Sequence, residues 1–240
     1  MFKYTLFLLL LTIFFIFFCD NDDPTGINEK IVIEDYLNTP LTMLNLGDSY
    51  TIGESVSFSE RWPNQLHQRL LDSNLVVSEP LIIAKTGWQT IQLMSAIDNY
   101  DLDEYYDLVT LLIGVNDQYR GVPFYYYENN FKQLLSTAIQ LANNNPDNVI
   151  VISIPDYSVT PFGQQLDTAK IKEELTLFNQ INLDAATDAG VHYVNITPIS
   201  QMAEMDLSLL APDRLHPSGK MYTKWVDLIF PVALDILNDS

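Results

Sequence analysis

The clearest structural signal in this sequence is Leu41-Thr42-Met43-Leu44-Asn45-Leu46-Gly47-Asp48-Ser49-Tyr50-Thr51, in which a short apolar run leads directly into glycine, aspartate and serine. Runs of this length without polar alternation are typical of strands buried on both faces of a parallel sheet. The polar residues that follow lie where such a strand ends. In open α/β sheets that end of the strand borders the ligand crevice.

Four more apolar runs follow at intervals, Leu81–Ala84, Leu108–Ile113, Val149–Ile154 and Val191–Val194. The segments between them carry apolar residues at helical spacing, and a last amphipathic stretch covers residues 220–237. The alternation predicts an α/β fold: a three-layer α/β/α sandwich, flavodoxin-like, with a mostly parallel five-stranded sheet. The expected inward helix faces are Trp62, Leu66 and Leu70; Ile91, Met94 and Ile97; Phe131, Leu134, Leu135 and Ile139; and Ile171, Leu175, Phe178 and Ile181.

The composition limits the classes of partner. The 240 residues include 31 Asp and Glu against 12 Lys and Arg, a formal charge of −19. Nucleic-acid binding needs a basic surface, so no nucleic-acid partner is expected. The length suits one ordinary α/β domain. The sequence does not indicate an oligomeric state.

The N-terminal region resembles an export signal. Residues 4–19 carry no charge and follow Lys3. As a helix this run would span roughly 24 Å, which is short of the ~30 Å hydrocarbon core of a bilayer. We therefore expect residues 1–18 to be a signal peptide rather than a permanent membrane span.

Cys19 is the only cysteine, so no intrachain disulfide is possible. Its position after the apolar run resembles a bacterial lipoprotein signal, in which the thiol is lipidated; Phe18 departs from the small residue usual there. The alternative is a cysteine that merely ends a signal or an anchor helix. The acidic and polar composition up to Pro40 predicts a tether at residues 19–40 and a folded domain at 41–240. The resemblance to lipoproteins implies an exported protein of a bacterial envelope, facing the periplasm or the cell surface. Its only membrane contact would be the N-terminal lipid.

Ser49 lies at the entry to a helix after the first strand. Its hydroxyl there would face the crevice, where helix N-terminal amides favour developing negative charge. The competing interpretation is that Ser49 only caps the helix.

Two later segments also end at the expected crevice. Asn116 follows the strand at 108–113 and could aim an amide N–H at an oxyanion, although asparagine is also a common turn residue. Gly87 follows the strand at 81–84, where the lack of a Cβ lets the backbone approach a ligand closely.

The segment Asp213-Arg214-Leu215-His216 places a carboxylate three residues before a histidine. Histidine is suited to general-base catalysis near neutral pH when a carboxylate holds its Nδ1–H. The other two histidines, His67 on an expected helix and His192 in an expected strand, are interpreted as structural.

Together these segments resemble the SGNH hydrolases, also called GDSL esterases and lipases. Ser49, Gly87, Asn116, Asp213 and His216 match that family's blocks in kind and in order, over roughly residues 43–218. Tyr50 departs from the leucine of many members. The Gly-x-Ser-x-Gly elbow of α/β-hydrolases is a poorer match, because Thr51 occupies its last position.

The resemblance implies a serine esterase acting on short acyl or acetyl esters, including those of glycans, through an acyl-enzyme on Ser49. It implies His216 as base, Asp213 as its orienting carboxylate, and Ser49, Gly87 and Asn116 as the oxyanion hole. Neither cofactor nor metal is implied. Two alternatives stay open: an O-acyltransferase with the same triad, and a surface binding lipoprotein without turnover.

The resemblance implies a small-molecule or glycan ester as the substrate, and loop aromatics are candidates for its pocket. They cover helix ends equally well in the competing interpretation. These aromatics are Tyr50, Trp88, Tyr119, Phe124, Tyr125, Tyr126, Tyr127, Tyr157 and Phe162.

Overall fold

The five apolar runs form five strands in the computed structural model, which describes residues 39–238. All of them pair in parallel, in the order β2-β1-β3-β4-β5. Every residue of β1, β3 and β4 is buried, which explains why their runs show no polar alternation. The strands are β1 (Met43–Gly47), β2 (Leu81–Ala84), β3 (Leu108–Leu112), β4 (Val149–Ile152) and β5 (His192–Val194).

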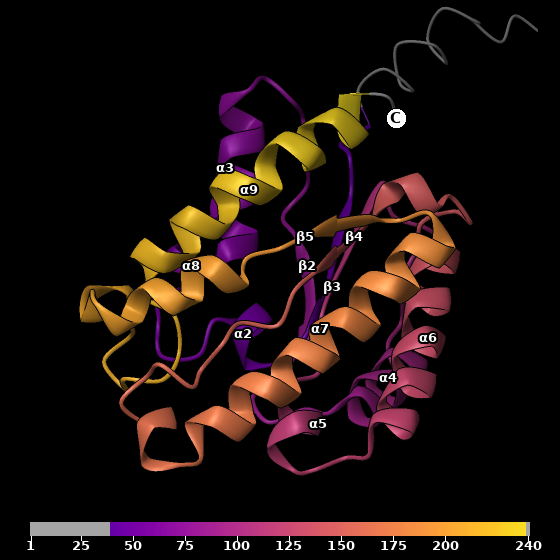
Figure 1. Ribbon diagram of the computed structural model, residues 1–240. Helices are drawn as coiled ribbons and strands as arrows, with labels where there is room; N and C mark the ends of the chain where they lie inside the picture. The colour runs from indigo at the N-terminus through magenta and orange to yellow at the C-terminus, as the bar shows by residue number, and fades with distance from the viewer. Residues whose placement is uncertain (1–38, 239–240) are drawn as a thin grey trace, which may run out of the picture. The chain divides into compact units, whose positions relative to one another are not determined.

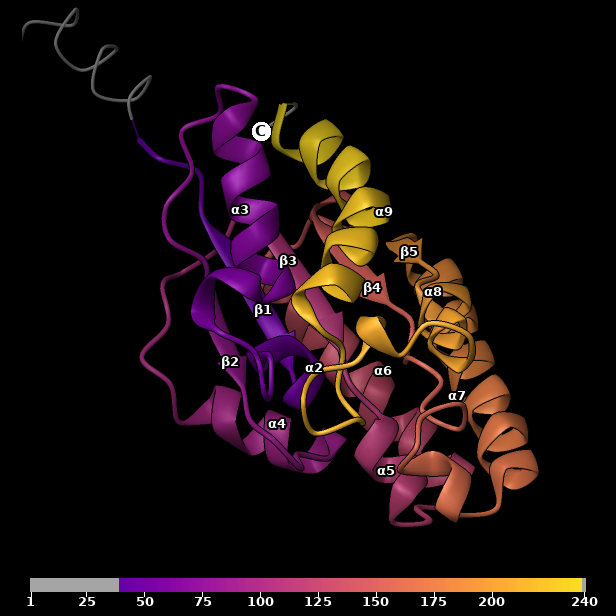
Figure 2. The same ribbon diagram turned by 90° about the vertical axis from the view of Figure 1, so that its left-hand side faces the viewer.

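Helices cover both faces of this sheet, so the predicted three-layer α/β/α fold is confirmed (Figures 1 and 2). The pair α3 and α9 covers one face, and α4, α6 and α7 cover the other. The helices are α2 (Ser49–Ile52), α3 (Trp62–Asp72), α4 (Thr90–Asp98), α5 (Val115–Tyr119), α6 (Phe124–Leu141), α7 (Thr168–Ala189), α8 (Thr197–Gln201) and α9 (Gly219–Asn238).

The strands that follow β1 in the chain are added to the sheet on opposite sides of it. The chain passes from β1 to the edge strand β2 and then returns over the sheet to β3, which pairs with the other side of β1. The connections that leave β1 and β3 therefore diverge at their carboxyl ends. This divergence opens a crevice at the point where α/β folds bind ligands.

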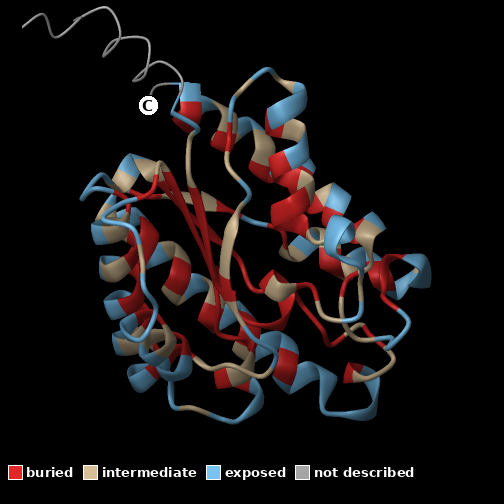
Figure 3. Ribbon diagram, turned by 180° about the vertical axis from the view of Figure 1, so that it is seen from behind, coloured by how far each residue is buried: buried red, intermediate tan, exposed pale blue. Residues whose placement is uncertain are grey.

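The core lies between the sheet and the inward sides of the helices (Figure 3). One residue of the predicted helix faces is wrong: Ile91 of α4 is 61% exposed, whereas Leu93 is buried beside the predicted Ile97. Hydrogen bonds at the start of α4 explain why Ile91 points outward. The Thr90 N–H and hydroxyl both donate to the Asp117 carboxylate, at 2.9 and 2.7 Å. These bonds set the rotation of α4 about its axis.

The described chain begins at Thr39, at the amino ends of the strands, and α9 ends at that same end of the sheet (Figures 1 and 2). The predicted signal peptide and nearly all of the predicted tether lie outside the described residues. Within residues 39–238, no helix combines the length and the apolar character needed to cross a bilayer.

Candidate active site

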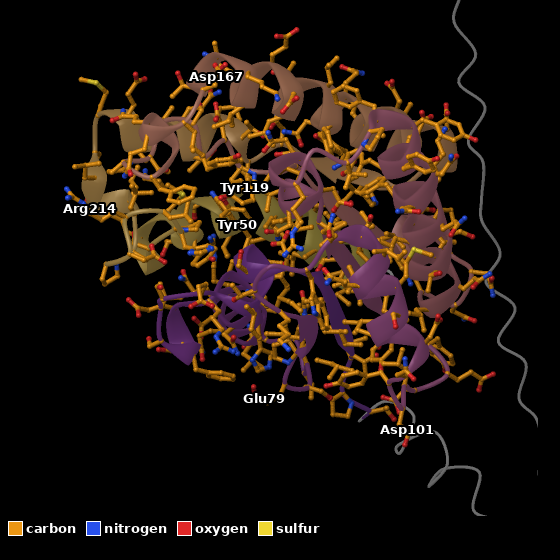
Figure 4. All side chains as sticks on the ribbon, turned by 90° about the horizontal axis from the view of Figure 1, so that it is seen from below. Tyr50, Glu79, Asp101, Tyr119, Asp167 and Arg214 are labelled. Atoms are coloured by element: carbon orange, nitrogen blue, oxygen red, sulfur yellow. The ribbon has the colours of Figure 1, made fainter. Side chains whose placement is uncertain are left out.

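A cavity of about 200 Å³ lies at the carboxyl ends of the strands. Ser49, Gly87, Asn116 and His216 all line it, although they come from four separate segments of the chain. Figure 4 views the molecule from this side, with Tyr50 and Tyr119 labelled near its centre. The fold thus brings four of the five residues predicted for the site to one cavity, and the fifth, Asp213, lies behind His216.

Ser49 is the first residue of α2, and its side chain is not the helix cap. The preceding residue, Asp48, takes that role by accepting the Tyr50 N–H at 3.0 Å. Ser49 itself is buried but reaches the cavity. The cap interpretation of Ser49 is therefore wrong, because the carboxyl group of Asp48 satisfies the helix N–H and leaves the serine hydroxyl at the cavity.

The Asp48 carboxyl is fully enclosed. Burial raises its pKa to about 8, against the lowering effect of the Tyr50 N–H, and the negative charge of Asp117 adds to the rise. The second oxygen, Oδ2, has no hydrogen-bond partner among the described residues. At neutral pH the group beside Ser49 is thus mainly a neutral carboxylic acid.

His216 is held by Asp213. Its Nδ1 lies 2.7 Å from Asp213 Oδ2, and the other carboxylate oxygen accepts the N–H groups of Leu215 and His216 at 2.9 and 3.0 Å. Tyr50 packs edge-on against the imidazole, with 5.6 Å between ring centroids. A hydrogen bond and a ring contact therefore fix the imidazole at the cavity.

Ser55 is a residue of the site that the sequence motifs did not reveal. Its hydroxyl donates to Asp213 Oδ2 at 2.6 Å from 158 positions away in the chain. Partial burial raises the pKa of Asp213, but the hydrogen bonds from Ser55, from the His216 side chain and from two backbone N–H groups outweigh it and lower that pKa to about 2. The carboxylate is therefore ionised over the whole neutral range.

The two other motif residues have backbone or hydrogen-bond constraints of their own. Asn116 donates an amide N–H to the Trp88 carbonyl at 3.0 Å, which orients its side chain at the cavity. Gly87 has φ of +82°, a conformation that L side chains rarely adopt. Gly114, before α5, has φ of +129°, and a Cβ there would collide with the Tyr127 hydroxyl.

Four of the nine candidate aromatics line the cavity, namely Tyr50, Tyr119, Tyr157 and Phe162. The others lie elsewhere: Tyr127 is in the core, while Tyr125 and Tyr126 are exposed. The wall formed by Tyr157 and Phe162 is closely packed, because a Cβ on Gly163 would overlap the Tyr157 carbonyl.

The two remaining histidines lie away from this cavity. His67 is buried, and its Nε2 lies 3.0 Å from the Val77 carbonyl, while His192 belongs to β5. Over residues 39–238, no three His, Cys, Asp or Glu side chains gather in a set that could hold a metal ion.

Comparisons with solved structures show the same fold in several proteins, some of them described as esterases. The protein TesA aligns with a TM-score of 0.63 and 16% identity, over 81% of this chain and 99% of its own. An acetylxylan esterase from Geobacillus stearothermophilus gives 0.60 and 16%, over 82% and 94%. The psychrotrophic esterase EstA from Pseudoalteromonas sp. gives 0.59 and 20%, over 82% and 98%.

The sequence comparisons address the family directly. None of the curated proteins matches this chain. Residues 46–224, which include all five motif residues, match the GDSL-like lipase/acylhydrolase family. That span is well over half of the sequence, and this chain therefore belongs to the GDSL-like lipase/acylhydrolase family and is an ester-hydrolysing enzyme.

Proposed function

We propose that the protein is a serine esterase in which Ser49 is the nucleophile, His216 the general base and Asp213 its orienting carboxylate. One observation carries the proposal: a hydroxyl from the start of the domain and an imidazole from near its end line the same cavity, and a carboxylate holds the imidazole at Nδ1. Hydroxyl, imidazole and carboxylate are the parts of a serine hydrolase triad.

The proton route follows from the ionisation of Asp213. With its pKa near 2 this carboxylate accepts the Nδ1–H of His216, which leaves the lone pair on Nε2. Nε2 removes the Ser49 proton as the serine oxygen attacks the ester carbonyl, and it returns that proton to the departing alcohol. Water then attacks the acyl-serine by the same route, and the carboxylic acid is released.

The oxyanion of each tetrahedral intermediate would be stabilised by three N–H donors. These are the backbone N–H groups of Ser49 and Gly87 and the Asn116 side chain. The amide of Asn116 has two hydrogens, and the bond to the Trp88 carbonyl engages one of them. The second is suited to the negatively charged oxygen.

Short, uncharged acyl groups are the best fit to this cavity. Its volume of about 200 Å³ is below the roughly 300 to 1,000 Å³ of sites for drug-sized ligands, and Val115, Phe162 and Leu215 give it apolar walls. The chain's charge of −19 disfavours polyanionic esters. The structural relatives described as an acetylxylan esterase and an esterase support the same substrate class.

The N-terminal sequence supports export and attachment. We propose that Cys19 is lipidated after removal of residues 1–18 and that the enzyme is a lipoprotein of a bacterial envelope. The support is the uncharged run that ends at Cys19 and the acidic residues that follow it.

Labelling with a fluorophosphonate probe tests the nucleophile. The probe should modify Ser49 in the wild type, and Ser49→Ala should lose both the label and the hydrolysis of p-nitrophenyl acetate. Ser95→Ala, a change on the exposed side of α4, is the matched control and should be labelled normally. Equal hydrolysis by Ser49→Ala would overturn the proposal.

A further inference from the structure

A second cavity, of about 320 Å³, borders the first one. Tyr119 and Tyr157 line both cavities, so the two spaces meet at these rings. The far side of the second cavity carries Asp167, Lys170 and Glu174. In Figure 4, Tyr119 lies between Tyr50, which lines the first cavity, and Asp167, which lines the second.

A chain of hydrogen bonds links the two spaces. The Tyr157 hydroxyl donates to Gln118 Oε1 at 2.8 Å, and Gln118 Nε2 donates to Glu174 Oε2 at 2.8 Å. Both Tyr157 and Gln118 are buried. Glu174 in turn lies 3.8 Å from the Lys170 ammonium. The polar side of the second cavity is therefore fixed to the wall of the first.

The lining of the second cavity fits a neutral, polyhydroxylated ligand. Tyr119 is 55% exposed and can stack against an apolar ring face. The carboxylates of Asp167 and Glu174 accept hydrogen bonds from hydroxyls, and Lys170 donates to them. An aliphatic chain would leave these charged groups poorly solvated, and the two carboxylates would repel a bound anion. Lys170, 3.8 Å from Glu174, offsets one of these carboxylates.

We propose that the second cavity binds the alcohol half of the substrate and that this half is a sugar. Its ring stacks on Tyr119, its hydroxyls contact Asp167, Lys170 and Glu174, and its ester group enters the first cavity at Ser49. This inference rests on the proposed function and adds the class of alcohol that the enzyme recognises.

The test compares a sugar ester with an ester that has no sugar. The enzyme should be assayed as the full chain with 6-O-acetylglucose, a sugar ester that keeps its other hydroxyls free, and with p-nitrophenyl acetate. Asp167→Asn keeps a good helix cap, and Lys170→Ala keeps a good helix former, so α7 remains intact in both variants. Each variant should raise the ratio of the two KM values, sugar acetate over p-nitrophenyl acetate, about fivefold.

Lys172→Ala is the matched control, because Lys172 is an exposed lysine of α7 that lines neither cavity. It should leave the KM ratio unchanged. Tyr119→Ala should raise the ratio more than Tyr119→Phe, which keeps the ring. The same KM rise with octyl acetate as with the sugar acetate would overturn the assignment to a sugar.

A binding measurement separates this inference from the proposed function. Titration calorimetry of the Ser49→Ala protein with 6-O-acetylglucose should give a Kd that rises about fivefold when Asp167→Asn is added. An unchanged Kd, in a protein whose wild type hydrolyses p-nitrophenyl acetate through Ser49, overturns the sugar site alone. Loss of the Ser49 dependence itself overturns the proposed function.

Discussion

The Asp213 carboxylate receives four hydrogen bonds, and one of them comes from the other end of the domain. The donor is Ser55, which has φ of 66°, while Arg214, next to Asp213, has φ of 62°. Left-handed backbone at residues other than glycine is uncommon. Two such residues therefore flank the carboxylate that orients His216.

Replacing Ser55 should impair catalysis without touching the proposed nucleophile or base. Ser55→Ala removes a hydrogen bond to a charged group, worth about 1.5 to 3 kcal/mol, so kcat should fall about tenfold or more with little change in KM. Steady-state kinetics with p-nitrophenyl acetate measures this. The loss should be larger at low pH, because the pKa of Asp213 rises when the Ser55 donor is removed.

Ser59→Ala is the control for this change, since Ser59 is exposed nearby and has no bond to Asp213. Its kcat should match that of the wild type. A kcat for Ser55→Ala equal to the wild-type value would mean that backbone N–H groups alone orient Asp213.

Asn116 should contribute mainly to the transition state. Loss of one oxyanion donor typically costs about 3 to 4 kcal/mol, so Asn116→Ala should lower kcat about a hundredfold or more while the protein stays folded. Asn99→Ala is a matched control, because the Asn99 amide also donates to a backbone carbonyl but lies at the exposed end of α4. A fall in kcat of less than threefold for Asn116→Ala would exclude it from the oxyanion hole.

At the level of helices and strands, α2 begins at an aspartate that is neutral in the folded protein. In an unfolded chain a carboxyl with a pKa of about 3.9 is ionised above that pH, whereas the folded protein keeps the Asp48 proton up to about pH 8. Between these values the folded state binds more protons than the unfolded state. Its stability therefore falls as the pH rises through this window.

Asp48→Asn should remove this pH dependence. An asparagine oxygen can still accept the Tyr50 N–H, and it carries no proton to lose. The decrease in Tm between pH 5 and pH 8 should become smaller by a few degrees, as measured by circular dichroism. The exposed variant Asp188→Asn should keep the wild-type slope, and an identical slope in Asp48→Asn would show that Asp48 is ionised in the fold.

The strands could be predicted closely because burial on both faces leaves a direct trace in the sequence. Even the edge strands, β2 and β5, coincide with apolar runs of the expected length. The exposure of Ile91 on α4 could not be predicted, since the bonds from Thr90 to Asp117 join residues 27 positions apart. The contact of Ser55 with Asp213 could not be predicted for the same reason. The motif residues could be predicted because each lies in a short stretch of sequence that resembles a block of the family.

At the level of the whole chain, the N-terminal prediction is tested by one substitution. Cys19→Ser removes the only thiol, so the enzyme should move from the membrane fraction to the soluble fraction of its bacterial host. Immunoblotting of the two fractions measures this, with the wild type as reference. Continued membrane association of the variant would favour an uncleaved anchor helix.

Both ends of the described chain leave the domain at the amino ends of the strands, whereas the catalytic cavity lies at the carboxyl ends. A solid support coupled at the carboxyl end of α9 would therefore lie on the side of the sheet opposite the cavity. Enzyme immobilised there should keep its catalytic cavity open to esters in the surrounding solution.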